Sequence, residues 1–353
     1  MKLTKEILEY ALIGGTILGG GGGGAKESGR ELGEYALEYG FPELIGIDKL
    51  DDDAIILNVS AVGAPAAPLK YADSNDYINT VKIFIDKLGL NVQGIITNEN
   101  GGCATINGWL QSSVLKIPMI DAPCNGRAHP TGLMGSLGLH RDKTYKSYQA
   151  VSGGNPELGN HVEGFVGGAL NKTSVIVRQY AVAAEGLVAV ARNPVKASIV
   201  KENAAIGGIS HAIDLGKVFY LGLETSNDEA INKVVEFLDG EIVSEGIIET
   251  LELQTTGGFD VGKLTVNGCE VTFWNEYMTV EKDNNRIATF PDLIMTFDKN
   301  TSMPVTSAEI REGQEVILIK TSKENLKLST TMQQEELLKD IEDILNKEII
   351  AFN

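Results

Sequence analysis

The chain has few cysteines and lacks any long apolar run. Its 353 residues include only Cys103, Cys124 and Cys269, too few and too scattered for a disulfide framework or a Cys-x-x-Cys metal site. Such a small number of scattered cysteines indicates a protein of the reducing cytoplasm. No stretch of about 18 apolar residues is present to span a bilayer, and the segment Met1–Glu6 lacks the cationic-then-apolar pattern of a signal peptide. We therefore expect a cytoplasmic protein without a membrane partner.

Positive charge is also scarce. The chain carries 30 Lys and Arg against 48 Asp and Glu, which gives a formal net charge of −18 and a pI of about 4.7. Such a protein repels phosphate backbones and anionic lipids, so we expect no nucleic-acid partner. The sequence is 43% hydrophobic with 6% aromatic residues. Its length suffices for two domains with a sizeable core.

Glycine, in contrast, is abundant and clustered. Six of the 40 glycines form the run Gly19–Gly24, between segments with helical spacing at 4–13 and 26–39. Ordering so many glycines costs chain entropy, so a folded protein needs a reason to keep them. One interpretation is that the backbone N–H groups of Gly21, Gly22 and Gly23 bind an anion at a helix start. The other is that the loop packs too closely against its neighbours for any β-carbon. No P-loop or dinucleotide motif is present, and both interpretations stay open.

Strands and helices alternate in the first half of the chain. Apolar runs at 53–60, 94–97 and 114–120 are typical of buried strands, and the segments 77–88 and 105–115 have helical spacing. This alternation predicts an α/β fold, with a three-layer α/β domain at 1–168 built on a mostly parallel sheet. The loops at 61–68, 98–103 and 121–130 would then meet at one edge of that sheet, where α/β proteins usually build their sites.

The pattern changes in the C-terminal region, 169–353. Segments 175–180 and 187–191 look β-like, and 195–215 and 227–238 look helical. From Gly240 onward, short β-type runs alternate with turn signals such as Asn267-Gly268, which predicts a small β-barrel-like domain at about 240–329. A closing helix at about 332–350 has apolar residues at helical spacing, and we expect it to pack back on the α/β part.

The segment 121–130, Asp-Ala-Pro-Cys-Asn-Gly-Arg-Ala-His-Pro, gathers reactive side chains in one loop. The bland interpretation is a turn in which Asp121 caps a backbone and Arg127 pairs with a surface carboxylate. The functional one places a site here. Asp121 or Glu99 would act as general base or orient His129, and Cys124 would be a nucleophile if neighbouring cations lowered its pKa.

The same hypothesis assigns roles in substrate binding. Arg127 would hold a substrate carboxylate or imide oxygen bidentately. Asn100 and the backbone N–H groups of Gly101 and Gly102 would stabilise a developing oxyanion. A divalent metal could be bound by carboxylate and imidazole side chains of this cluster, but no ligand motif of recognised spacing is present. We therefore predict no metal site and no cofactor.

Several short motifs occur together in a consistent order. They are Gly63-Ala64-Pro65, Asn98-x-Asn100-Gly101, Asp121-Ala122, Gly126-Arg127-Ala128-x-Pro130, Asn275-Glu276-Tyr277 and Pro291-Asp292-Leu293-Ile294. With the glycine-rich N-terminal turn, they resemble the S-methyl thiohydantoin desulfurase-like family, formerly domain of unknown function 917. The resemblance implies an N-terminal three-layer α/β domain and a C-terminal part with a β-barrel. It also implies a link to hydantoinase and oxoprolinase-type systems, which handle five-membered cyclic amides, and desulfuration of a thiohydantoin is one named activity.

Two functions follow as hypotheses. The first is an enzyme acting on a small cyclic amide or thioamide, hydrolytic or desulfurating, through the acid, Arg, His and Cys cluster. The second is a non-catalytic metabolite-binding or accessory subunit of a hydantoinase or oxoprolinase-type system. Both take a small-molecule ligand. Glycine-lined helices near a domain edge also favour a homo-oligomer.

Overall fold

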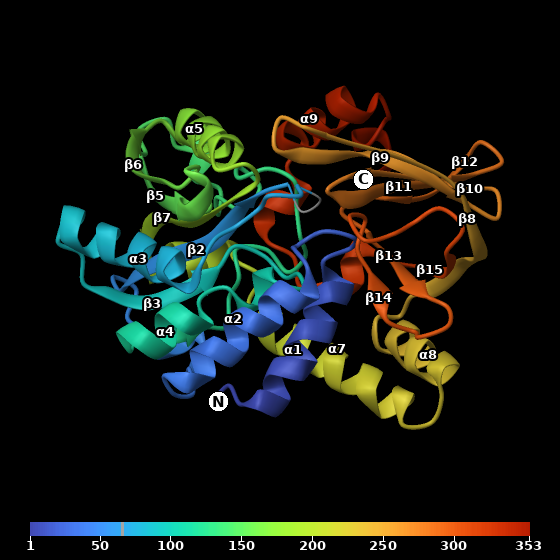
Figure 1. Ribbon diagram of the computed structural model, residues 1–353, viewed down its shortest axis with the longest axis horizontal. Coiled ribbons are helices and arrows are strands. Elements are labelled where there is room, and N and C mark those ends of the chain that lie inside the picture. Colours follow the sequence, from blue (N-terminus) through green and yellow to red (C-terminus); the bar gives the residue numbers. More distant parts are fainter. Residues whose placement is uncertain (65–66) are drawn as a thin grey trace.

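Two β-sheets and the helices packed against them make up the protein in the computed structural model, which describes residues 1–64 and 67–353 (Figure 1). Pro65 and Ala66, part of the loop predicted at 61–68, lie outside the described residues. The helices are α1 (Lys5–Leu18), α2 (Lys26–Glu38), α3 (Ser74–Leu88), α4 (Trp109–Leu115), α5 (Leu170–Ala183), α6 (Ala197–Asn203), α7 (Gly208–Leu223), α8 (Asn227–Phe237) and α9 (Glu335–Leu345). None of the described helices combines the length and the apolar character needed to cross a membrane.

The first sheet is mixed but mostly parallel. Within the described residues it has seven strands in the order β1-β4-β3-β2-β7-β5-β6. Their bounds are β1 (Leu44–Ile45), β2 (Ile55–Gly63), β3 (Val92–Thr97), β4 (Met119–Ile120), β5 (Ser147–Gly153), β6 (Val162–Gly168) and β7 (Leu187–Lys196). Strands β1, β4, β3 and β2 pair in parallel. Strand β7 is antiparallel to both β2 and β5, so β5 runs in the direction of the parallel group.

Helices cover both faces of this sheet, which confirms the predicted three-layer α/β architecture. Side chains alternate along β2 between the two faces. Leu57 and Val59 pack with α2, α3 and α4 on one face, whereas Ile56 packs towards α6 and Val62 towards α5 on the other. Arg192 of β7 lies opposite Asn58 of β2 in the register. Cross-strand neighbours share a face, so both polar side chains lie on the α5 and α6 side.

Segment 175–180 is helical, and its β-like interpretation is wrong. It belongs to α5, whose buried residues Leu170, Thr173, Val177 and Ala181 recur at helical spacing. The adjacent β-branched residues at 175 and 176 favour a strand by propensity. Both are exposed, however, so they do not decide the structure, and burial of the opposite helix face does.

The second sheet is antiparallel throughout. In the described part of the chain its eight strands follow the order β12-β11-β10-β9-β8-β15-β13-β14. The strands are β8 (Glu241–Thr256), β9 (Phe259–Val266), β10 (Cys269–Trp274), β11 (Glu276–Lys282), β12 (Asn285–Thr289), β13 (Leu293–Asp298), β14 (Pro304–Val305) and β15 (Glu315–Thr321). The long strand β8 pairs with β9 through one half and with β15 through the other. Leu264 of β9 and Leu318 of β15, which come from the two sides of β8 in this sheet, share one core. This arrangement is compatible with the predicted barrel-like domain.

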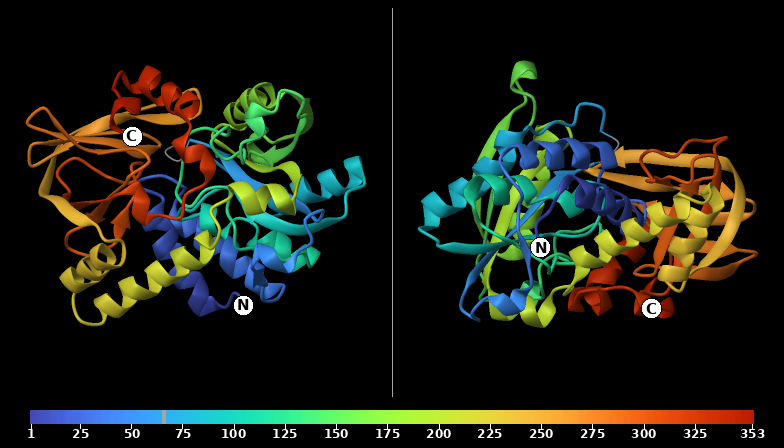
Figure 2. Two further views of the ribbon diagram at one scale, coloured as in Figure 1. Left: turned by 180° about the vertical axis from the view of Figure 1, so that it is seen from behind. Right: turned by 90° about the horizontal axis from the view of Figure 1, so that it is seen from below.

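Helices α1 and α7 join the two sheets into one body. Leu8 and Leu12 of α1 belong to the core of the α/β part, whereas Ile13 and Ile17 pack with α7, α8 and the second sheet. Gly14 allows this crossing, because a β-carbon there would lie 1.7 Å from the carbonyl oxygen of Ala212 in α7. Figure 2 shows α7 (yellow) passing from the α/β part towards the second sheet. The crossing of α1 and α7 therefore connects the core of the α/β part with the core that includes the second sheet.

The closing helix α9 packs mainly on the second sheet. Leu337, Leu338 and Ile341 lie in a cluster with Trp274 and with Met134, a residue of the loop between β4 and β5. The helix therefore contacts both parts of the molecule.

Candidate functional site

A cavity of about 450 Å³ lies where the α/β part meets the second sheet. The α/β part lines it with the ends of β2 and β3, the loop 129–133, α5 and Arg192 of β7. The second sheet lines it with the β8–β9 turn and the β10–β11 turn. Polar and charged lining residues include Asn98, Glu99, Asn107, His129, Arg178, Arg192 and Glu276. Ligand sites commonly occur at such domain boundaries.

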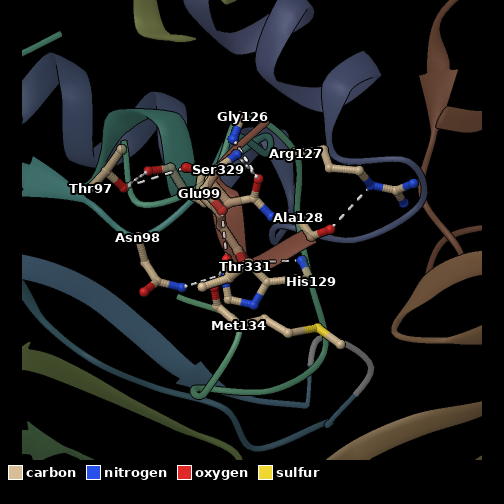
Figure 3. A network of polar contacts seen from close by, with 12 residues as sticks. Thr97, Asn98, Glu99, Gly126, Arg127, Ala128, His129, Met134, Ser329 and Thr331 are labelled. Carbon is tan, nitrogen blue, oxygen red and sulfur yellow. Dashed lines mark hydrogen bonds and ion pairs between the residues drawn. The ribbon is translucent and has the colours of Figure 1, made fainter. Parts of the chain in front are cut away.

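Glu99, Asn98 and His129 form the polar centre of the cavity on the α/β side (Figure 3). His129 Nε2 lies 3.3 Å from Glu99 Oε2 and 3.0 Å from Asn98 Nδ2. The backbone N–H of His129 also donates to Glu99 Oε2, at 3.2 Å. Asn58 Nδ2 donates to Asn98 Oδ1 at 3.0 Å. The loop after β3 and the loop 121–130 are thus tied together around one carboxyl group.

Between about pH 3 and pH 7, Glu99 is protonated and the imidazole of His129 is not. Burial raises the pKa of Glu99 to about 7 and lowers the pKa of His129 to about 3, because both lose the water that would stabilise their charged forms. His129 is therefore neutral, and Glu99 changes protonation near neutral pH. A carboxyl group with such a pKa suits acid–base catalysis.

Arg192 is a buried cation without a partner. Its relative exposure is 4%, and in residues 1–64 and 67–353 no hydrogen bond or ion pair reaches its guanidinium, with Nε fully enclosed. Burial lowers its pKa, opposed by Cys124 and Glu99. An unsatisfied buried charge is costly. A ligand with an oxygen or negative charge in the cavity would satisfy it.

Arg178 of α5 reaches across to the second sheet. Its Nη1 donates to the carbonyl oxygens of Gly63, at 3.1 Å, and Gly258, at 2.8 Å. Its guanidinium lies 4.0 Å from the centre of the Phe259 ring. Burial lowers its pKa to about 10, so it stays cationic and fastens the β8–β9 turn over the cavity.

Asp121 lies outside the cavity and caps a helix. It accepts hydrogen bonds from the backbone N–H groups of Ile209, at 2.9 Å, and Ser210, at 3.1 Å, at the start of α7. A carboxylate there satisfies otherwise unpaired donors and complements the helix dipole. The structure therefore gives Asp121 the capping role of the bland interpretation rather than a place beside Glu99.

Arg127 also lies outside the cavity, and it joins the two parts of the molecule. Its Nη1 donates to the carbonyl oxygens of Pro291, at 3.1 Å, and of Asp292, and its guanidinium lies 4.5 Å from the centre of the Phe290 ring. In Figure 3 its side chain points away from His129. Nη1 of Arg127 is thus bound to the second sheet, whereas its buried Nη2 has no hydrogen-bond partner among the described residues. Arg127 does not line the cavity, and Arg192 and Arg178 do.

Cys124 is buried in an apolar cluster with Ile96 and Ile120. Burial raises the pKa of its thiol to about 12, which disfavours the thiolate that a nucleophile requires. It does not line the cavity. The geometry separates it from the Glu99 and His129 pair with which the sequence grouped it.

Asn100, Gly101 and Gly102 hold loops together. Asn100 Nδ2 donates to the carbonyl oxygens of Gly126, at 3.1 Å, and Gly208, at 2.9 Å. The N–H of Gly101 donates to Thr105 Oγ1 at 3.0 Å. A β-carbon on Gly102 would lie 2.7 Å from the Gly24 carbonyl oxygen. None of these three residues lines the cavity, and their predicted oxyanion role stays a prediction.

Close packing explains most of the glycine run. A β-carbon on Gly21 would lie 2.7 Å from the Tyr277 ring, one on Gly22 2.0 Å from Glu276 Oε1, and one on Gly23 2.4 Å from Gly101 Cα. The carbonyl oxygens of this loop accept hydrogen bonds, such as that from Tyr277 N to Gly20 O at 2.7 Å. Gly23 also lines the cavity, so anion binding there stays a proposal.

Glu276, Arg178 and Arg192 are charged residues of the site that the sequence did not single out as functional, and Asn98 and Asn107 are further polar cavity residues that it did not single out. Arg192 follows the apolar run 187–191, and an arginine within a buried strand was an available signal. Glu276 lies in Asn275-Glu276-Tyr277, one of the motifs behind the family resemblance. Arg178 gave no signal, because it lies in the segment 175–180 that looked β-like, and nothing in that pattern indicates that its side chain faces a cavity.

The residues present do not assemble a metal site. In the described ranges 1–64 and 67–353, no three His, Cys, Asp or Glu side chains come together in a way that could hold an ion.

The chain matches one family over nearly its whole length. The S-Me-THD-like N-terminal domain matches residues 6–156 and the S-Me-THD-like C-terminal domain matches residues 170–332. The fold and the two-part cavity are thus those of an α/β protein with an antiparallel β-domain, and the chain belongs to the S-Me-THD-like family. The second matched region includes β7, which lies inside the first sheet, so the regions interlock in space.

A solved structure supports the fold. The crystal structure of a protein from Chromobacterium violaceum superposes with a TM-score of 0.73 at 17% sequence identity, covering 98% of this chain and 96% of that one. At this identity the likeness concerns the fold alone. A comparison with curated proteins gave no match.

Proposed function

We propose that the protein is an enzyme that hydrolyses or desulfurates a small cyclic amide or thioamide of the hydantoin or thiohydantoin type. The observation that carries this proposal is Glu99, a cavity carboxyl group with a pKa of about 7, hydrogen-bonded beside the neutral imidazole of His129. Family membership supports the substrate class, because the S-Me-THD-like name denotes S-methyl thiohydantoin chemistry.

Binding of the ring falls to the arginines of the cavity. The guanidinium of Arg192 has an enclosed Nε and no hydrogen-bond partner among the described residues, and it would donate to a carbonyl, imide or carboxylate oxygen of the substrate. Developing negative charge on that oxygen would strengthen the interaction, since the buried guanidinium is already fixed in place. A cavity of about 450 Å³ is within the size range of small-molecule sites and accommodates a five-membered ring with a substituent.

Glu99 would carry the proton transfer from water. In its ionised form it takes a proton from a water molecule, whose oxygen bonds to the C=O, C=N or C–S carbon. The displaced electron pair moves to the exocyclic carbonyl oxygen or to the ring nitrogen. When the intermediate collapses, the C–N or C–S bond breaks, and the leaving nitrogen or sulfur takes the electron pair and one proton. Substrate and water are consumed, and a ring-opened product or a hydantoin and a thiol are formed.

The alternative is a binding subunit that captures the same metabolite for a hydantoinase or oxoprolinase-type partner. Arg192 alone would support such capture, because binding does not need a titrating carboxyl group. The titrating Glu99 has no use in that role, and this favours the enzyme.

The test is turnover by the purified chain. The panel comprises hydantoins, thiohydantoins, S-methyl thiohydantoins and 5-oxoproline, each with and without a chelator, with thermal shift as the binding readout. We expect at least one compound to stabilise the protein and to be consumed, and Glu99→Gln to bind that compound without consuming it. A compound that is bound and never consumed would support the binding subunit instead.

A further inference from the structure

A second carboxyl group faces the cavity from the second sheet. Glu276 is the first residue of β11, its relative exposure is 2%, and it lines the cavity with Glu99. Its Oε2 is enclosed and has no hydrogen-bond partner among the described residues. A buried carboxyl group in this state has an unused donor or acceptor, which a ligand in the cavity would engage.

The backbone around Glu276 is fixed on both sides. Asn275, at φ 57°, donates from its N–H to Asp260 O at 2.7 Å, and its Oδ1 accepts from Asp260 N at 2.9 Å. On the other side, Tyr277 N donates to Gly20 O at 2.7 Å. Gly22 leaves the space that Oε1 occupies, since a β-carbon there would lie 2.0 Å from it. The glycine loop and the β10–β11 turn together hold this carboxyl group in place.

We propose that Glu276 is the proton donor to the leaving group, working across the cavity from Glu99; this rests on the proposed function. Glu99 removes one proton from the attacking water, and the hydroxyl oxygen bonds to the substrate carbon. The C–N or C–S bond then breaks, and the leaving atom takes the bonding pair and the proton of Glu276. The proton on Glu99 afterwards returns to Glu276 through cavity water, so both groups are restored and one water is consumed.

The charges around Glu276 are compatible with this division of labour. Burial raises the pKa of Glu276 well above its usual range, and Glu99 raises it further, whereas Arg127 and Arg178 lower it. Arg192, Lys70 and Asp340 are the other charged residues that line the cavity, and the glycine run Gly19–Gly24 contributes no charged side chain. Ionisation of Glu99 therefore holds the proton on Glu276. Two carboxyl groups whose environments separate their pKa values are the usual arrangement for one base and one acid.

The first experiment locates the proton without needing turnover. Infrared difference spectra of the intact protein at pH 7 compare wild type, Glu276→Gln and Glu249→Gln, the latter an exposed carboxylate of the same sheet. We expect Glu276→Gln to remove a protonated-carboxyl band and Glu249→Gln to remove none. If Glu276→Gln removes no such band, Glu276 is ionised and cannot be the acid.

The second experiment separates leaving groups. An amide nitrogen needs a proton in order to leave, whereas a thiolate leaves readily without one. We expect Glu276→Gln to lower kcat by about 10²–10⁴-fold on compounds in which a C–N bond is broken. On S-methyl thiohydantoins the loss of kcat should be less than tenfold. KM and thermal stability at neutral pH should be nearly unchanged or improved. Glu276→Asp, which keeps the acid on a shorter side chain, should recover part of the loss.

The outcomes distinguish this inference from the proposed function. Equal losses on both bond types with an unchanged pH profile would assign Glu276 a structural role and overturn the inference alone. Absence of turnover on the whole panel would overturn the proposed function, and the acid role with it.

Discussion

Glu99 is the side chain whose protonation state should control the reaction. Its pKa of about 7 means that the base form increases as the pH rises through neutrality. We expect kcat/KM to rise with pH and to level off above about pH 7, with one ionisation of that pKa on the acidic limb. Measurement from pH 5 to 9 checks this. A rate that is flat across pH 6–8 would exclude Glu99 as the titrating base.

The same proton should be visible in stability. The folded-state pKa of Glu99 is raised above its ordinary value. The contribution of this group to the free energy of unfolding is therefore most favourable below about pH 4.3, and it is lost as the pH rises to about 7. Glu99→Gln has no such loss. We expect this variant to be more stable than wild type at pH 8, on the order of 1–3 kcal/mol, with little difference near pH 4, as measured by urea unfolding. A wild type that is the more stable at pH 8 would contradict the raised pKa.

Cys124 provides a contrasting test at the residue scale. Its thiol is fully buried and its pKa is raised to about 12, so a nucleophilic role is disfavoured. We expect Cys124→Ala to retain turnover and to lose about 1 kcal/mol of stability, the scale of a small buried group. Cys269→Ala, another buried cysteine, is the matched control. Loss of turnover in Cys124→Ala alone would restore the nucleophile hypothesis.

At the scale of elements, the loop 121–130 follows β4 of the first sheet and contacts the start of α7. Asp121 caps that helix through Ile209 and Ser210, and Asn100 binds the carbonyl oxygen of Gly208 beside it. The reactive side chains of this segment therefore have two different roles, lining the cavity and binding neighbouring elements together. His129 reaches the cavity, and Asp121 and Arg127 fasten neighbouring elements.

Removal of the helix cap should affect stability and not chemistry. We expect Asp121→Ala to lower the free energy of unfolding by about 0.5–2 kcal/mol, with kcat per folded molecule retained. Asp121→Asn keeps an oxygen acceptor and should lose less. Thermal unfolding with turnover on the same samples checks both. Abolished turnover in a stable Asp121→Asn protein would return Asp121 to the site.

Local periodicity predicted much of this element structure, and tertiary geometry decided the site. Strand–helix alternation indicated the three layers, and the loops after β3 and β4 do meet, through His129 and Glu99. Spacing along the chain could not show which way each loop side chain points. It also could not show that Arg192 of β7 lies beside β2, because that pairing joins residues more than a hundred positions apart.

At the scale of the whole molecule, the cavity exists only because two parts pack together. Leu8 and Ile13 of the same helix enter different cores, and Arg127 binds the carbonyl oxygens at the start of β13. Glu99 comes from one part and Glu276 from the other. The sequence predicted two regions, but it gave no sign that the site lies at the boundary between them.

Arg127 should therefore matter for assembly of the cavity. We expect Arg127→Met to lose about 1.5–3 kcal/mol for each charge-assisted hydrogen bond removed, seen as a lower urea midpoint and reduced turnover. Arg141→Met is the control, because Arg141 pairs with Glu336 on the surface and should cost less than about 1 kcal/mol. If Arg127→Met were as stable as wild type and failed only in substrate binding, Arg127 would be a substrate ligand after all.

The most direct test of the account is a crystal structure of Glu99→Gln with a bound S-methyl thiohydantoin. We expect the ring in the cavity between the two parts, with an oxygen or anionic substituent on Arg192. Its reacting carbon should face position 99, and its leaving group should face Glu276. A ligand bound instead at Asp121, Cys124 and Arg127, with the cavity empty, would contradict the account.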